Sequence, residues 1–149
     1  MIKSMRFTAL VLPVVAIAAL AACDDTTTVV EERFFPAAVI VRLDTQAILV
    51  RADSVVRDTL VADTGANNLS FTLLRANGDT IATSVFGDTL FNVVVTPASG
   101  ALTYTPQTNL SGILTGNTPG PTSFTFTIRR RNLTVFGPTV VPVMVVEPD

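Results

Sequence analysis

The sequence predicts an all-β domain, an antiparallel sandwich of about eight short strands. Three observations support this fold class: apolar and polar residues alternate along most segments after residue 36, Gly, Asn and Pro separate these segments, and no segment has the 3.6-residue spacing of an amphipathic helix. The 149 residues are 48% hydrophobic and 15% charged. This length suits one domain, or one domain with an appendage.

The predicted strands are rich in Val, Ile, Leu and Phe, residues that fit a pleated and half-buried surface. Alternation is clearest at residues 39–43, 48–52, 69–73 and 124–129. Pro142 favours an edge or a bulge for the final strand, because proline lacks a backbone N–H. The further predicted strands are 54–62, 80–85, 89–96, 102–106 and 140–146.

Turn residues fall between these strands. Asn77-Gly78 stands between two strand-like segments, and Asn-Gly predicts a hairpin because both residues accept a positive φ. Residues 107–122 hold three Gly and two Pro, so this stretch is predicted to be a loop.

The first 22 residues have the pattern of a secretory signal peptide. Lys3 and Arg6 give a positive start, and residues 7–22 carry no charge. This apolar run is short for a bilayer of about 30 Å, and Pro13 interrupts it. We therefore expect a cleaved signal peptide rather than a buried helix.

The end of this run resembles the lipobox of bacterial lipoproteins. All four positions match: Leu20, Ala21, Ala22 and Cys23. The resemblance implies that a diacylglycerol is attached to the Cys23 thiol, that a peptidase cuts before Cys23, and that fatty acids such as palmitate modify the new N-terminus. Two or more acyl chains anchor a protein stably to a membrane where one does not.

The predicted organisation has three parts: a signal peptide at 1–22, a lipidated Cys and polar tether at 23–36, and a β-sandwich at 37–149. The expected location is the bacterial cell envelope, on the periplasmic face or the cell surface. Asp24 and Asp25 follow the Cys. They resemble an inner-membrane retention signal in enterobacterial lipoproteins and a surface-export signal in other phyla. The sequence therefore does not distinguish the inner from the outer membrane.

Composition excludes several kinds of chemistry. The chain has no His and one Cys, so it cannot assemble a His–Cys metal site, a Ser–His–Asp triad or an internal disulfide. We expect no cofactor and no metal. Without residues 1–22 the chain keeps eight Arg, no Lys and twelve acidic residues, a formal charge of −4. Such a domain has no electrostatic signature for nucleic acid.

The second half resembles the cadherin-like and Ig-like repeats of bacterial surface proteins. In those repeats a "G-x-L-x-Y-x-P" strand precedes an "N-F-x-G" turn, matched here by residues 100–106 and 109–112. The following Phe strand matches residues 123–128, and a Val-rich last strand matches 139–146. The resemblance covers about a third of the chain and implies an Ig-like or cadherin-like sandwich.

Calcium binding is not expected, although some of those repeats carry a calcium-associated turn after the Phe strand. Here that place reads Arg129-Arg130-Arg131-Asn132, without an acidic residue. No "D-x-D-x-D-G" loop occurs in the chain.

Arg129, Arg130 and Arg131 form the one cluster of like charges. They could bind lipid headgroups, an acidic polysaccharide or the carboxylates of a partner. Alternatively, they are solvated residues at a strand end that protect a sheet edge.

Three functions are compatible with these features. The first is a non-enzymatic interaction or adhesion module, anchored by lipid, with a protein or glycan partner. The second is a periplasmic subunit of an envelope-assembly complex that pairs through an edge strand. The third and weakest is a glycan hydrolase with two catalytic carboxylates, because Asp is far more common as a turn residue. The candidates for such a pair are Asp44, Asp53, Asp58, Asp63, Asp79 and Asp88.

Overall fold

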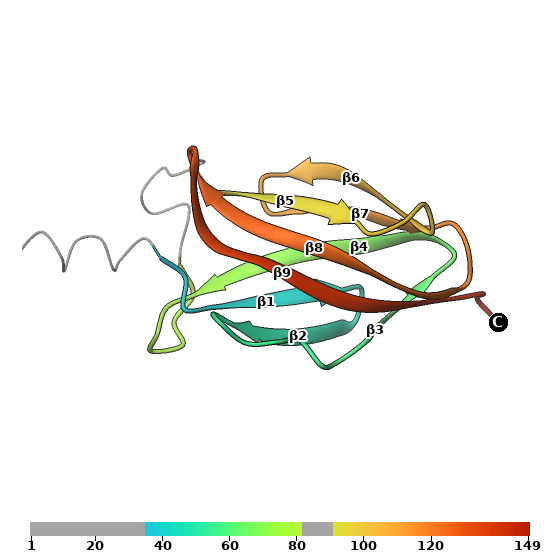
Figure 1. Ribbon diagram of the computed structural model, residues 1–149, viewed down its shortest axis with the longest axis horizontal. Coiled ribbons are helices and arrows are strands. Elements are labelled where there is room, and N and C mark those ends of the chain that lie inside the picture. The colour runs from blue at the N-terminus through green and yellow to red at the C-terminus, as the bar shows by residue number, and fades with distance from the viewer. Residues whose placement is uncertain (1–34, 82–90) are drawn as a thin grey trace, which may run out of the picture. The chain divides into compact units, whose positions relative to one another are not determined.

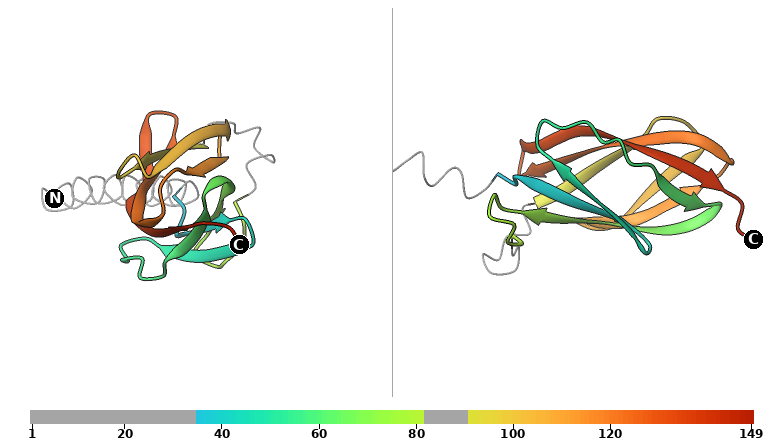
Figure 2. Two further views of the ribbon diagram at one scale, coloured as in Figure 1. Left: turned by 90° about the vertical axis from the view of Figure 1, so that its right-hand side faces the viewer. Right: turned by 90° about the horizontal axis from the view of Figure 1, so that it is seen from below.

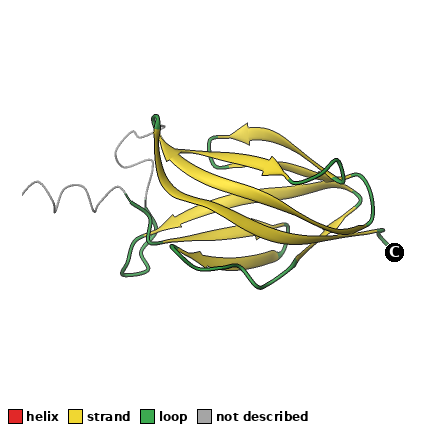
Figure 3. Cartoon of the chain, in the orientation of Figure 1, coloured by secondary structure: helices red, strands yellow, loops and turns green. Residues whose placement is uncertain are grey.

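Two β-sheets face each other in the computed structural model, which describes residues 35–81 and 91–149 (Figure 1). Coloured by secondary structure, the described chain consists of strands and loops without a helix (Figure 3). Phe35–Asp149 forms one compact unit. The predicted all-β sandwich is confirmed, with nine strands in the described residues rather than about eight.

The first sheet has five antiparallel strands in the order β2-β1-β4-β7-β6. Its two longest-range pairings join β1 to β4 and β4 to β7, so the middle of the sheet brings together the beginning and the second half of the domain. The strand bounds are β1 Ala38–Leu43, β2 Gln46–Arg51, β4 Gly65–Leu74, β6 Leu102–Thr108 and β7 Ser111–Gly116.

The second sheet has four strands in the order β3-β9-β8-β5. The pairs β5–β8 and β8–β9 are antiparallel, whereas β3 pairs with β9 in parallel, from Leu60↔Val143 to Asp63↔Val146. The strand bounds are β3 Leu60–Asp63, β5 Phe91–Pro97, β8 Gly120–Arg130 and β9 Leu133–Val146.

Seven of the nine strands have the arrangement of an Ig-like sandwich. In such folds the strands A, B, E and D form one sheet and G, F and C form the other. Here β1-β4-β7-β6 and β9-β8-β5 occupy those places in chain order, and β2 and β3 are additions at the sheet edges. The Ig-like part of the prediction is therefore confirmed, with the parallel β3 as a departure from a purely antiparallel sandwich.

Period-2 alternation produces the core, because every second side chain of a strand faces the opposite sheet. Val39, Val41 and Leu43 of β1 are fully buried, as are Phe124 and Phe126 of β8. Three rings connect the sheets: Phe71 of β4 lies 5.1 Å from Phe126, measured between ring centroids, and Phe126 lies 6.0 Å from Phe136 of β9. Aromatic pairs at these separations add to the free energy of area burial.

Two side-chain amides hold the short strand β3. Gln46 of β2 donates from Nε2 to the Val61 carbonyl at 2.7 Å and accepts from the Val61 N–H at 2.9 Å. Asn67 of β4, only 1% exposed, accepts from the Asp63 N–H and donates to the carbonyls of Asp63, Gly65 and Leu114. Along the other edge of β3, which does not face β9, these amides make the hydrogen bonds that a second neighbouring strand would make. β3 is therefore fixed to both sheets.

The prediction of a loop at 107–122 is wrong. This stretch contains the whole of β7 and the beginning of β8. Gly112 and Gly116 lie in β7 rather than in turns, because each meets another part of the chain closely: a Cβ at Gly116 would lie 2.5 Å from the carbonyl oxygen of Asp63. Glycine occurs at these positions because other parts of the chain approach its backbone closely. Sequence patterns do not show this, since glycine is also common in turns.

The predicted strand at 54–62 is confirmed only from Leu60 onward. Residues 54–59 have no ladder partner, because here the chain passes from the edge of one sheet to the edge of the other. Val55 is 84% exposed as a result. Apolar alternation cannot distinguish such a crossover from a strand.

The turn at Asn77-Gly78 is confirmed, although of the two residues only Gly78 has a positive φ. Gly78 has φ +89°, Arg75 donates its N–H to the Asp79 carbonyl at 2.8 Å, and Leu74 pairs with Thr80 beyond the turn. The rest of the predicted strand at 80–85 falls on residues outside the described ranges. Pro142 lies at a local edge, as expected, because β3 joins β9 only from Val143 onward.

Candidate functional site

Two groups of residues predicted to be functional fall in different parts of the chain. The lipobox residues Leu20, Ala21, Ala22 and Cys23 lie outside the described residues. The arginines 129–131 lie at the turn between β8 and β9. In the described part of the chain, no helix is long and apolar enough to cross a membrane.

The three arginines do not converge on one point, because neighbouring residues of a strand face opposite sides of its sheet. The Arg130 guanidinium carbon lies 5.9 Å from the centroid of the Phe91 ring, on the core side of β8. Arg129 donates from a terminal nitrogen to the Asn132 carbonyl at 2.9 Å, which stabilises the turn. Arg131 is exposed and occupies the left-handed region with φ +54°. The cluster is thus both a turn structure and a source of exposed charge.

A pair of buried polar atoms adjoins this cluster. Asn92 of β5 is in register with Arg129 of β8. The Asn92 Oδ1 and the Arg129 Nε are both buried, and neither has a hydrogen-bond partner among the described residues. One of these atoms is an acceptor and the other a donor, and they belong to residues at paired positions of neighbouring strands. Sequence patterns did not single out Asn92, because register decides which residue faces Arg129.

Two of the described carboxylates, Asp44 and Asp79, belong to turns, whereas Asp63 lies in β3. Asp44 accepts from the backbone N–H of Asn68 at 2.8 Å, and Asp79 accepts from the side-chain nitrogen of Asn77 at 2.9 Å. Within residues 35–81 and 91–149, no group of three or more His, Cys, Asp or Glu side chains could hold a metal ion. Asp88 lies outside the described residues.

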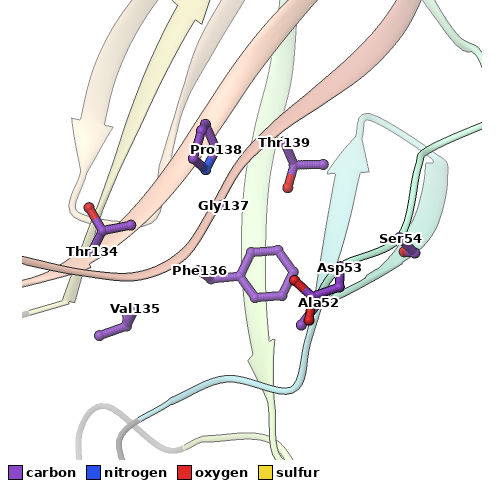
Figure 4. Close-up of a pocket in the computed structure, with 9 residues that line it drawn as sticks. All are labelled: Ala52, Asp53, Ser54, Thr134, Val135, Phe136, Gly137, Pro138 and Thr139. Carbon is purple, nitrogen blue, oxygen red and sulfur yellow. The ribbon is translucent and has the colours of Figure 1, made fainter.

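A pocket of about 300 Å³ lies between the end of β2 and the beginning of β9 (Figure 4). Asp53 is the one charged residue of its lining, and Ser54, Thr134 and Thr139 add hydroxyls; Ala52, Val135, Phe136, Gly137 and Pro138 complete the lining. The backbone is unusual on both sides: Asp53 has φ +61° and Gly137 has φ +86°. A single carboxylate cannot provide the acid and base pair of a glycosidase, although the pocket has room for a small polar molecule.

The outer face of the four-stranded sheet is uncharged over most of its length. It is formed by side chains that point away from the core, and the only charges in line with it are Arg129 at one end and Asp63 at the other. Val94, Val140, Met144 and Val61 are exposed there. Cross-strand neighbours include Val94↔Thr127, Thr125↔Val140 and Val61↔Met144. Sequence patterns do not reveal this face, because strand order, which brings these residues together, is not visible in a linear pattern.

No model of a known protein family matches the chain, and no curated protein matches it. Among solved structures, the chain is similar to domains 4 and 5 of the S-layer protein SbsC, with 19% sequence identity and a TM-score of 0.40. The similarity covers 74% of this chain and 66% of the length of that chain.

Proposed function

We propose that the protein is a lipid-anchored, non-enzymatic interaction module of the bacterial cell envelope. The observation that carries the interaction role is the outer face of the four-stranded sheet, where exposed Val and Met side chains are interspersed with Thr. Charged residues are depleted at the centres of protein interfaces, and such a face loses little solvation when it is covered. A protein or glycan partner is expected to bind across β5, β8 and β9.

Support for the anchor comes from the sequence. The lipobox pattern ends at Cys23, and this is the only Cys of the chain. A domain that folds through its aliphatic and aromatic core needs no disulfide, which agrees with the lack of a second Cys.

Acyl labelling tests the anchor. In bacteria fed a labelled fatty acid, the full chain should incorporate label, and Cys23→Ala should lose it, whereas the neighbouring Thr26→Ala should keep it. Persistent label in Cys23→Ala would contradict the lipoprotein assignment. Protease treatment of intact cells, with an epitope after Asp149, then reports the side of the envelope, because only a surface domain loses the epitope before the outer membrane is opened.

Two matched variants test the interaction face. Val94→Asp with Val140→Asp places two charges on the outer face, while Val55→Asp with Leu49→Asp places two charges on exposed residues elsewhere. Crosslinking in cells followed by isolation should recover the partner with the native chain and with the second variant, and lose it with the first. Equal recovery from both variants would show that the face is not the interface.

The alternative, a subunit of an envelope-assembly complex, rests on the edge strand β6. This strand ends its sheet, and Thr103, Thr105 and Gln107 are exposed. Pro106 and the bulge that follows it interrupt the ladder, which leaves only the first half of β6 regular enough for a further strand. Thr105→Lys would oppose such pairing, because a charged side chain on an edge strand disfavours the addition of a further strand, and it leaves the outer face of the other sheet unaltered. Turnover in a glycan panel would instead support the hydrolase.

A further inference from the structure

One end of the sandwich is basic, and it is the end where the polypeptide enters the domain. β1 begins at this end, where β2 and β4 finish, as shown by the pairing of Ala38 with both Arg51 and Leu74. The turn between β8 and β9 lies at the same end, because the pocket between residues 52–54 and 134–139 joins the two sheets there. The views of Figures 1 and 2 agree on this arrangement.

Charge is distributed unequally between the two ends. Five arginines and two aspartates gather at what we name the basic end: Arg51, Arg75, Arg129, Arg130 and Arg131, with Asp53 and Asp79. Four acidic residues and one arginine gather at the opposite, acidic end: Asp44, Asp63, Glu147 and Asp149, with Arg42. Among the described residues, each end therefore has an excess of three charges of its own sign. This separation of charge gives the domain an electric dipole, which orients the domain in an external electric field.

Apolar side chains project at the basic end as well. Phe35 precedes β1 and is 45% exposed, and Leu133 follows the β8–β9 turn and is 59% exposed. Arg131 lies two residues before Leu133, and Arg51, Arg75 and Arg131 are all exposed. Exposed apolar residues next to guanidinium groups are the combination that binds the boundary between headgroups and acyl chains.

We infer that the basic end docks on the anionic phospholipid headgroups of the membrane that holds the anchor. This inference rests on the proposed lipid anchor. The guanidinium groups of Arg51, Arg75 and Arg131 bind lipid phosphates, for which their planar donor geometry is suited. Phe35 and Leu133 insert between the headgroups. The acidic end, repelled by the same surface, points away and leaves the outer face of the four-stranded sheet upright and accessible.

The length of the connecting chain permits this contact. Twelve residues from Cys23 to residue 34 span at most about 40 Å when fully extended, and any shorter distance is open to them. Attachment to the bilayer also keeps the basic end at a high effective concentration near the lipids. A small number of arginines and two apolar side chains are then sufficient for docking.

Single tryptophans on β9 test the orientation, since the chain contains no Trp. Leu133→Trp places the probe at the basic end, and Met144→Trp places it on an exposed position near the acidic end of the same strand. The two positions are about 36 Å apart along the strand. The lipidated full chain is reconstituted in phosphatidylcholine vesicles with and without phosphatidylglycerol. Emission, quenching by brominated lipid and flotation with the vesicles are then measured.

We expect Leu133→Trp to shift to shorter wavelength and to be quenched in anionic vesicles, with the effect reversed by high salt. Met144→Trp should change in neither kind of vesicle. Arg51→Gln with Arg75→Gln should lower the docked fraction relative to the undocked one by roughly 10- to 30-fold. The matched control, Arg42→Gln with Arg57→Gln, removes the same charge away from the basic end and should have little effect.

The outcomes separate docking from anchoring. Flotation without a change at position 133, a change at position 144, or equal effects of the two arginine pairs would overturn docking and leave the anchor intact. A chain that does not float with the vesicles would overturn the anchor and the docking together.

Discussion

The ring of Tyr104 on β6 lies directly against Gly112 on the neighbouring strand β7. A Cβ at Gly112 would come within 2.6 Å of the ring and 2.5 Å of the Thr105 carbonyl oxygen. These two residues are the Tyr and the Gly of the motif that resembles bacterial surface repeats. Their contact gives the motif a structural role, since an aromatic side chain covers the backbone that glycine leaves bare.

Gly112→Ala should therefore destabilise the domain. The added methyl group has to displace Tyr104 or the β6 backbone, and such overpacking lowers the free energy of unfolding by about 1–3 kcal/mol. Urea denaturation followed by circular dichroism measures the change. Gly100→Ala is the matched control, because open space surrounds that position, and it should stay within about 0.5 kcal/mol of the native chain. Equal midpoints for the two variants would contradict the close contact.

Tyr104 should make stability depend on alkaline pH. Burial raises the pKa of Tyr104 above its ordinary value of 10.0, because the phenolate is poorly solvated there. The unfolded chain consequently loses its phenol proton first, so stability is full below pH 10 and falls as pH rises through the folded-state pKa. Tyr104 is the only Tyr, so phenolate absorbance reports this group alone. Tyr104→Phe should remove its share of the alkaline loss; an unchanged profile would contradict the assignment.

The hydroxyl of Tyr104 offers a second readout from the same variant. It is buried without a hydrogen-bond partner among the described residues. Because removal of the hydroxyl breaks no hydrogen bond, Tyr104→Phe at neutral pH should keep or slightly increase the free energy of unfolding. A loss above about 1 kcal/mol would indicate that the hydroxyl is bonded.

Asn67→Leu should be strongly destabilising. The Asn67 amide bonds four backbone groups, so its loss removes a partner from the Asp63 N–H and from three carbonyls, of which the Leu114 carbonyl is bonded in a buried place and the others in part-buried ones. Unpaired buried polar groups cost about 1–3 kcal/mol each, and partial rearrangement makes about 2–4 kcal/mol the expected total. Asn132→Leu, the same exchange at an exposed position, is the control for unfolding midpoints. A small effect at Asn67 would show that β3 is held by the sheet alone.

Gln46→Ala should loosen β3 without unfolding the domain. The Gln46 amide makes two hydrogen bonds to Val61, and both are exposed, so about 1 kcal/mol is expected. Hydrogen exchange at the Val61 N–H should accelerate more than exchange in β1. Gln107→Ala on the exposed part of β6 removes the same side chain as a control and should leave the Val61 N–H protected.

The sequence by itself determined the fold class and the places of most strands. The apolar residues Leu69, Phe71 and Leu73, alternating with Ser70 and Thr72, indicate a two-sided strand, and Asn77-Gly78 indicates a reversal, because both are consequences of local backbone geometry. The turn roles of Asp44 and Asp79 were predictable for the same reason. Local chemistry also predicts the lipidation of Cys23, which stays a prediction.

Only the tertiary structure decided which residues meet. Gly112 and Gly116 read as loop residues until their contacts with Tyr104 and Asp63 across strands explain them. The uncharged outer face and the basic end assemble from strands far apart in the chain, such as the pair β3 and β9. Strand order and register depend on packing between the two sheets, and a linear pattern holds no information about which edge a strand joins. For that reason the sequence predicted a sandwich, whereas the surfaces on which its function depends came from the fold.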